Sequence, residues 1–150
     1  MKKLLELAFS VALLLCLLTA YSTNSSKAYT FTVDNGDKIK IELNTADKYD
    51  LSAELPFVIS CDGKTLSQGS FVLAESYQQY VSVVNTDENA ELLDSGTKDG
   101  NEYIFWCYNG SEYNYAILIK GSNTGIVLGN PISKESAKEC FDRMAITVED

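Results

Sequence analysis

One stretch near the middle of the chain decides the predicted fold: Tyr103-Ile-Phe-Trp-Cys-Tyr-Asn-Gly-Ser-Glu-Tyr-Asn-Tyr-Ala116. Aromatic and apolar residues flank the pair Asn109-Gly110, which readily takes the positive φ angles of a two-residue hairpin turn. We therefore predict a hairpin with antiparallel strands over 102–108 and 111–120. In this register Trp106 faces Tyr113 across the ladder.

The period of two along these strands divides their side chains between two faces. One face would carry six apolar or aromatic side chains: Ile104, Trp106, Tyr113, Tyr115, Ile117 and Ile119. If a helix covers this face, its rings belong to the core. If none does, Trp106, Tyr113 and Tyr115 form an aromatic platform for a ligand. These three are our candidate ligand-binding residues, and both interpretations stay open at this point.

The rest of the chain predicts more strands and two amphipathic helices. A second Asn-Gly pair indicates a hairpin over 30–41. Short apolar runs indicate further strands over 55–60, 90–94, 126–128 and 145–148. Apolar residues recur at helical spacing over 71–85, and again after Ser133, a typical N-cap. The predicted fold class is therefore α+β, with one antiparallel sheet of about six strands and two amphipathic helices packed on it.

This order of elements resembles the PsbP-like αβα sandwich. The resemblance includes the N-terminal hairpin, a helix, an antiparallel meander, a helix over Ser133-Lys-Glu-Ser-Ala-Lys-Glu-Cys-Phe-Asp-Arg-Met144 and a final strand over 145–148. It covers most of the mature chain and rests on the order of elements, without a signature motif. It implies an extracytoplasmic or lumenal binding subunit or a small scaffold protein, and it transfers no catalytic residue.

The N-terminus has the three parts of a secretory signal: a basic start, an apolar run over Leu4–Ala20 and a polar segment rich in small residues. We therefore predict a signal peptide over 1–28 and a single α+β domain over 29–150. Cleavage after Ser22 and cleavage after Ala28 both fit the pattern.

Two alternatives to cleavage remain. The apolar run contains Glu6 and is marginal in length for a hydrocarbon core of about 30 Å, but it could serve as a retained membrane anchor. Cys16 could be the lipidated residue of a bacterial lipoprotein, although Leu14 and Leu15 stand where such signals have small residues. Contact with a membrane is expected only through this segment.

Charge and composition exclude several classes of function. The formal net charge is −9, and a strongly acidic surface repels nucleic acid. The chain has no histidine, so it can form neither a Ser-His nor a Cys-His catalytic pair, and it offers no imidazole ligand for a metal. Any catalysis would depend on carboxylates, thiols, phenols or lysine.

Three cysteines remain after the signal segment: Cys61, Cys107 and Cys140. An odd number permits one disulfide at most, in any of three pairings. Cys107 and Cys140 lie on apolar faces and are expected to be small buried hydrophobic residues or partners in a disulfide. No Cys-x-x-Cys pair is present, which argues against a zinc site.

Oxygen-bearing side chains do not form a recognisable site. The segments 34–37 and 94–102 are rich in acidic and amide residues, but neither has the twelve-residue spacing of a calcium-binding loop, and hairpin turns need such residues in any case. Glu102 and Glu112 lie on neighbouring predicted strands, too far apart along the ladder for a retaining glycosidase pair. We expect no metal and no cofactor.

These observations favour a secreted or cell-surface domain of bacterial type that acts as a non-catalytic binding or accessory module. Its partner would be a protein, a peptide or a glycan, and no nucleic acid. The alternative is a secreted hydrolase that depends on carboxylates. The two differ in one structural feature, because a hydrolase needs acidic side chains that converge in a pocket.

Overall fold

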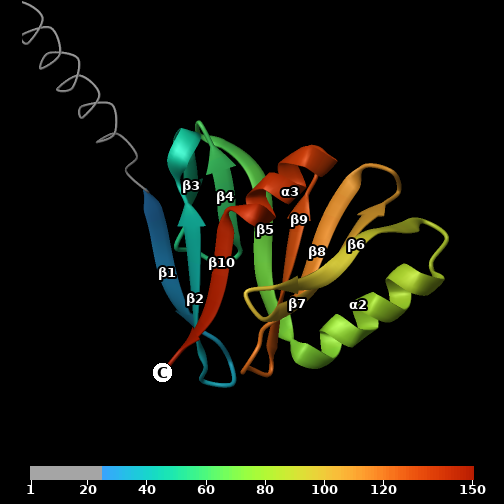
Figure 1. The fold of residues 1–150 in the computed structure, drawn as a ribbon, viewed down its shortest axis with the longest axis horizontal. Helices are drawn as coiled ribbons and strands as arrows, with labels where there is room; N and C mark the ends of the chain where they lie inside the picture. Colours follow the sequence, from blue (N-terminus) through green and yellow to red (C-terminus); the bar gives the residue numbers. More distant parts are fainter. Residues whose placement is uncertain (1–24) are drawn as a thin grey trace, which may run out of the picture.

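The computed structural model describes residues 25–150 as two antiparallel sheets with two α-helices (Figure 1). The strands are β1 (Ser26–Thr32), β2 (Lys38–Asn44), β3 (Tyr49–Leu51), β4 (Phe57–Cys61), β5 (Lys64–Leu73), β6 (Ala90–Lys98), β7 (Asn101–Tyr108), β8 (Glu112–Leu118), β9 (Thr124–Asn130) and β10 (Met144–Glu149). The helices are α2 (Ala74–Thr86) and α3 (Lys134–Asp142), with a short 3-10 helix, η1 (Ala46–Lys48). Most of the predicted signal segment, with Cys16, lies outside the described residues.

The strands form a small and a large sheet. Sheet A has the order β1-β2-β10, and sheet B has the order β3-β4-β5-β9-β8-β7-β6. The prediction of an α+β fold with one sheet of about six strands is therefore wrong, and the described chain has a mainly β fold. Most residues of β5 and β6 are partly or fully exposed, and many are polar. Because apolar alternation is the main sequence signal of a strand, much of these two strands looked like loop.

Sheet A and α3 pack on the same face of sheet B (Figure 1). The β2 side chains Ile39, Ile41 and Leu43 are fully buried in this main core. Phe57 of β4 is also fully buried, and its ring lies 6.1 Å from that of Phe31 in β1. The core between the two sheets is therefore apolar and aromatic, as burial on both sides requires.

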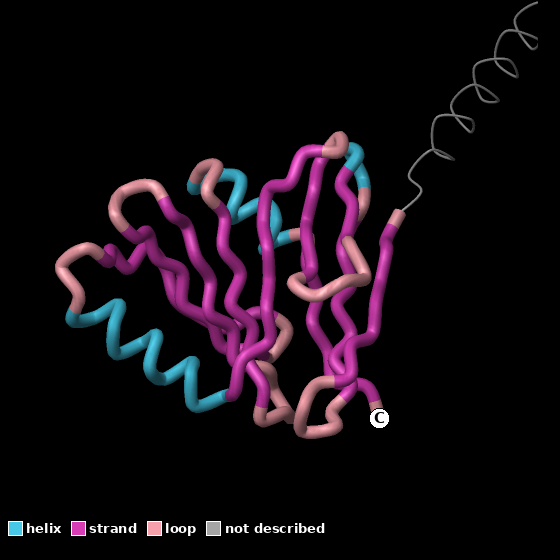
Figure 2. The backbone as a smooth tube through the Cα atoms, turned by 180° about the vertical axis from the view of Figure 1, so that it is seen from behind, coloured by secondary structure: helices cyan, strands magenta, loops and turns pink. Residues whose placement is uncertain are grey.

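Helix α2 packs on the opposite face of sheet B, at the end away from sheet A (Figure 2). It forms a second, smaller core with β7 and β8, made of Tyr77, Val84, Ile104, Trp106 and Ala116. The predicted helices over 71–85 and after Ser133 are confirmed, with α2 beginning three residues later than expected. The Ser133 hydroxyl accepts a hydrogen bond from Ser136 N at 3.0 Å and caps α3, as predicted.

The central hairpin forms, but its register differs from the predicted one by a residue. Tyr108 pairs with Glu112, so the turn contains Asn109, Gly110 and Ser111. Asn109 and Gly110 do adopt positive φ angles of 49° and 72°. The extra turn residue shifts every pair of the ladder, and a shift of one residue moves each side chain of one strand to the opposite face. The first hairpin also has a longer turn than predicted, with the five residues 33–37 between the paired Thr32 and Lys38.

The C-terminus of α3 is fastened by the β6–β7 corner of sheet B. The ammonium group of Lys98 donates to the carbonyl oxygens of Phe141, Asp142 and Met144, at 2.5, 3.0 and 2.7 Å. Burial lowers the pKa of Lys98, but the carbonyls of Phe141 and Asp142 end helix α3 and, with that of Met144 at the start of β10, are suited to hold a cation. Within residues 25–150, neither helix is long and apolar enough to cross a membrane.

Candidate functional site

The three candidate ligand-binding residues do not share a face of sheet B. Trp106 points toward α2, is 6% exposed and lies 5.6 Å from the ring of Tyr80. Tyr115 points the other way and stacks on Phe141 of α3 at 4.1 Å. Tyr113 lies on the same side as Tyr115 and packs at the margin of the main core. The predicted shared face is therefore wrong, and two of its three rings are covered by helices.

The three described cysteines are free thiols in three different settings. Cys107 is buried on β7, and Cys140 is fully buried on α3, where burial raises its pKa. Cys61 lies half-buried at the end of β4, with its sulfur 3.5 Å from the carbonyl oxygen of Asp47. At Cys140 burial outweighs the hydrogen bond with Ser67 and the charge of Arg143, both of which favour the thiolate, so this thiol is a poor nucleophile.

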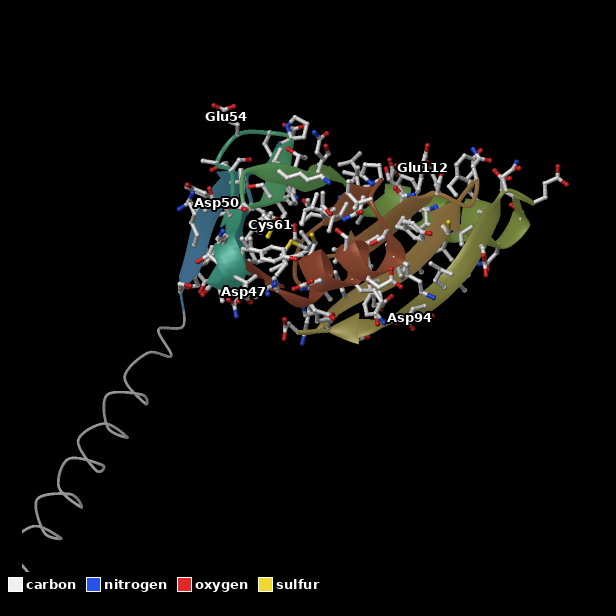
Figure 3. The ribbon with its side chains drawn as sticks, turned by 90° about the horizontal axis from the view of Figure 1, so that it is seen from above. Asp47, Asp50, Glu54, Cys61, Asp94 and Glu112 are labelled. Carbon is white, nitrogen blue, oxygen red and sulfur yellow. The ribbon has the colours of Figure 1, made fainter. Side chains whose placement is uncertain are left out.

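The carboxylates of residues 25–150 are mostly spread over the surface, but four of them, Asp47, Glu135, Glu139 and Asp142, line one surface pocket around Arg143. Glu112 pairs with Tyr108 at one end of the β7–β8 ladder, and Glu102 pairs with Leu118 at the other end. No group of three or more Cys, Asp or Glu side chains in the described chain could hold a metal ion. Figure 3 shows labelled carboxylates spread around the periphery and pointing away from one another. In the pocket around Arg143, Asp47 and Glu139 are both paired with the guanidinium, at 2.9 and 3.0 Å, so neither is an unpartnered acid or base.

The oxygen-rich turns hold the fold together. Asp37 accepts hydrogen bonds from the amide of Asn35 at 3.0 Å and from the hydroxyl of Ser122 at 2.5 Å. Asp94 accepts one from the hydroxyl of Tyr103 at 3.1 Å. These carboxylates therefore have partners within the protein, as expected of residues that fix turns.

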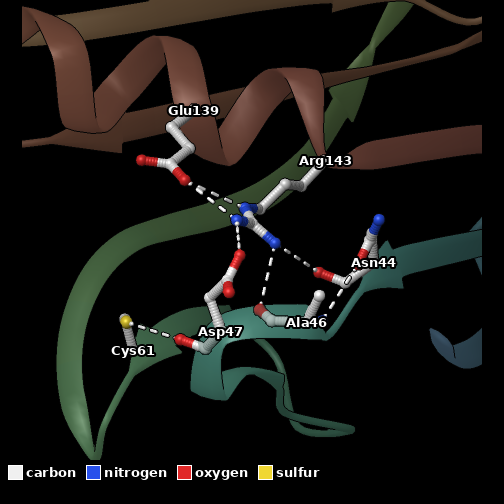
Figure 4. A network of polar contacts seen from close by, with 6 residues as sticks. All are labelled: Asn44, Ala46, Asp47, Cys61, Glu139 and Arg143. Atoms are coloured by element: carbon white, nitrogen blue, oxygen red, sulfur yellow. Dashed lines mark hydrogen bonds and ion pairs between the residues drawn. The ribbon is translucent and has the colours of Figure 1, made fainter. Parts of the chain in front are cut away.

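The only arginine of the chain forms the densest polar network (Figure 4). Its guanidinium donates to Glu139 and Asp47 at 3.0 and 2.9 Å and to the carbonyl of Ala46 at 3.0 Å. It also lies over the ring of Tyr49, with 3.9 Å between Cζ and the ring centroid. Because these contacts occupy the donors and one face of the guanidinium, Arg143 joins α3 to η1 and β3 and is not free to bind an anion.

A groove of about 600 Å³ crosses the face of sheet B that α2 only partly covers. We call it the open groove. Its floor comes from β5, β9 and β8, and one wall is formed by Tyr80 of α2. Strand spacing makes it about 10 Å wide from β5 to β8 and about 13 Å long from Gln68 to Val72.

One row of cross-strand partners defines the middle of the open groove. Gln68 of β5 pairs with Gly129 of β9, and Gly129 pairs with Asn114 of β8. Since residues that face each other across a ladder point to the same side, two amide side chains flank a position that has no side chain. A notch therefore lies over Gly129. The next residue along this row is Trp106, paired with Asn114 and covered by Tyr80.

On the opposite, buried face of the same strands, the polar side chains are hydrogen-bonded within the protein. There Asn130 donates to the hydroxyls of Ser67 and Ser136 at 2.9 and 3.0 Å, which ties β9 to β5 and to the start of α3. On the open face, Gln68 and Ser70 are exposed. The buried polar residues stabilise the fold, whereas the exposed ones are free to bind a ligand.

Sequence reasoning missed the open groove, because 64–70 was not recognised as a strand. The alternation of Gln68 and Ser70 with Ser67 and Gly69 contains no apolar residue, so no period of two is visible there. Comparison with known proteins gives no guide either: no protein-family model matches the chain, and no curated protein matches it significantly. The resemblance to the PsbP-like sandwich therefore stays a prediction.

Proposed function

We propose that this chain is a non-catalytic binding module that acts outside the cytoplasm and holds its ligand in the open groove. The observation that carries this proposal is a groove of about 600 Å³ whose lining contains a single carboxylate, Glu112. Its size is within the range of small-ligand sites, and the amides of Gln68 and Asn114 flank its centre. One carboxylate without a second acid or base nearby is poorly suited to hydrolysis.

The proposal of export rests on the N-terminal segment, and the start of the fold bears on where that segment would be cleaved. β1 begins at Ser26, and Lys27 forms an ion pair with Asp50 at 2.7 Å. Cleavage after Ala28 would remove three residues of β1, so we expect cleavage after Ser22. The mass of the exported chain checks this expectation. Lipidation or a retained anchor would give a different mass.

The test of the binding function fills the open groove without disturbing the core. Gly129 lies in an extended strand, and a Cβ there would meet only Asn114 Oδ1, at 3.3 Å. Gly129→Val should therefore fold normally and block the notch. We expect probes from arrays of glycans and uncharged peptides to be retained by the unmodified chain and lost by Gly129→Val. Equal retention by the two chains would contradict the proposal.

A second measurement separates binding from hydrolysis. Each retained probe is incubated with the protein and analysed by mass spectrometry, and we expect it to remain intact. Cleavage that disappears in Glu112→Gln would show instead a hydrolase that uses the one carboxylate of the open groove.

A further inference from the structure

The lining of the open groove favours an uncharged ligand. Among the described residues that line it there is no lysine or arginine, and the only charged side chain is Glu112. The chain as a whole has a formal net charge of −9. An anionic ligand would find no cation to neutralise it and would be repelled by this field. A cationic ligand would find only one carboxylate, at the end of β8.

The polar groups of the open groove suit a ligand that both donates and accepts hydrogen bonds. The amide of Gln68 offers two donors and an acceptor, and the hydroxyl of Ser70 offers both functions. The amide of Asn114 donates once to the carbonyl oxygen of Glu112, at 3.2 Å, and keeps one donor and its acceptor for a ligand. A carbohydrate presents hydroxyl groups with the same double capacity. Amides placed on either side of one ring can therefore bond to its edges without any change in charge.

The floor between the amides is flat and largely apolar. Gly129 leaves the notch open, and Val127 pairs with Ser70 in the next row of the sheet. Such a floor suits the C–H face of a sugar ring, while Tyr80 at the wall presents an aromatic ring with a polar end. Apolar contact below and hydrogen bonds at the sides are the two requirements for holding a sugar.

A peptide fits this surface less well. Extended peptides usually bind by adding a strand at the edge of a sheet, where unpaired backbone groups are available. The open groove lies in the middle of sheet B, where β9 is already paired with both β5 and β8. The backbone groups of a peptide would find only side-chain partners there, and any group left without one costs free energy.

We propose that the open groove binds an uncharged carbohydrate chain, with one sugar ring over Gly129 between the amides of Gln68 and Asn114. This inference rests on the proposed function, because it assigns a ligand class to the same groove.

The experiment uses isothermal titration and the fluorescence of Trp106, the only tryptophan, which lies next to Asn114 in the same row. The probes are maltohexaose, cellohexaose and chitohexaose as neutral sugars, a hexamer of galacturonic acid as an anionic sugar, and an uncharged hexapeptide. We expect at least one neutral sugar to bind, and the anionic sugar to bind at least about tenfold more weakly.

Variants locate the binding. Gln68→Leu removes one amide and should weaken binding of the neutral sugar about three- to tenfold, the effect of a lost neutral hydrogen bond. Gly129→Val should abolish binding. Gln78→Leu removes an exposed amide on α2 that does not line the open groove, so it should bind as the unmodified chain does.

The possible failures are distinguishable. If none of the three neutral sugars binds at millimolar concentration, the carbohydrate assignment is overturned. If the hexapeptide then binds, and Gly129→Val abolishes that binding, the proposed function stands without this ligand class. If a sugar binds equally well to Gly129→Val, both the ligand's place and the proposed site are wrong.

Discussion

Gly69 is the position where a single methyl group should cost the most stability for its size. It pairs across the ladder with Phe57, whose ring covers the space that a side chain at 69 would need. A Cβ at Gly69 would lie within 2.5 Å of Phe57 Cε1 and Cε2 and closer still to Cζ. Real Cβ atoms do not approach other atoms below about 3 Å, so either the ring or the strand must move.

The ring has little room to move. Phe57 is fully buried, and the rings of Phe31 and Phe71 lie 6.1 and 6.2 Å from it. Overpacking a filled core costs about 1–3 kcal/mol, and we expect Gly69→Ala to cost about 3 kcal/mol because both neighbours must also shift. This is a large part of the 5–15 kcal/mol that stabilises a typical domain.

A double-mutant cycle tests this explanation. Phe57→Leu removes the three ring atoms that the new methyl group would meet, so Gly69→Ala should cost almost nothing in that background. The coupling free energy should be about 3 kcal/mol, within the range seen for residues in contact. Urea unfolding followed by the fluorescence of Trp106 gives each free energy.

Gly129→Ala is the matched control, because it adds the same methyl group to the neighbouring strand β9, where the Cβ would meet only the end of one side chain, Asn114 Oδ1, at 3.3 Å. It should be neutral or stabilising by up to about 1 kcal/mol, the usual gain when alanine replaces a glycine whose backbone conformation alanine can adopt without strain. The explanation fails if Gly69→Ala costs less than about 1 kcal/mol, or costs as much in the Phe57→Leu background as in the unmodified chain.

Three further predictions concern the polar network and the thiols. Arg143→Lys should lower the free energy of unfolding by about 2 kcal/mol in urea titrations, mainly through lost bonds to backbone carbonyls; a loss below about 0.5 kcal/mol would show that the network is dispensable. Burial raises the pKa of Tyr49 from 10.0 to about 12. Its contribution to the free energy of unfolding should therefore be complete below pH 10 and be lost as the pH rises to 12. The loss should be smaller in Tyr49→Phe. In the chain without its signal segment, Ellman's reagent should label only Cys61 in the native state, and Cys107 and Cys140 only after unfolding; a native count of zero or three would contradict this burial.

The sequence predicted the parts of the fold that depend on local patterns. The periodic apolar residues of α2 and the N-cap of α3 were visible because a helix with one buried face repeats at a fixed spacing. The central hairpin was visible for a similar reason, since Asn109-Gly110 takes the required φ angles. What the dipeptide did not reveal was the turn length, and that one residue decided which rings share a face.

The number of sheets and the candidate site depended on contacts between distant segments. β10 joins β2 across about a hundred residues of chain, with Ile146 paired to Ile41, and no local pattern indicates that pairing. In the same way, the open groove is made by Gln68, Asn114 and Gly129 from three separate strands. Each of these residues alone looked like a polar or turn residue, and only the register of the sheet places them in one row.

The open groove exists because sheet B is wider than the helix that packs on it. Seven strands span about 29 Å across the sheet, whereas the thirteen residues of α2 span about 20 Å. The uncovered part of sheet B faces water, and Gln68 and Ser70 of β5 supply exposed polar side chains there. Contact with water does not by itself explain a glycine at the centre of a paired strand, because a glycine there weakens the strand. At Gly129 a side chain would meet only Asn114, so the glycine is not needed to avoid a clash with the backbone. An empty position between two amides is better explained by an object that occupies it, which is why the effect of Gly129→Val on binding is the decisive measurement.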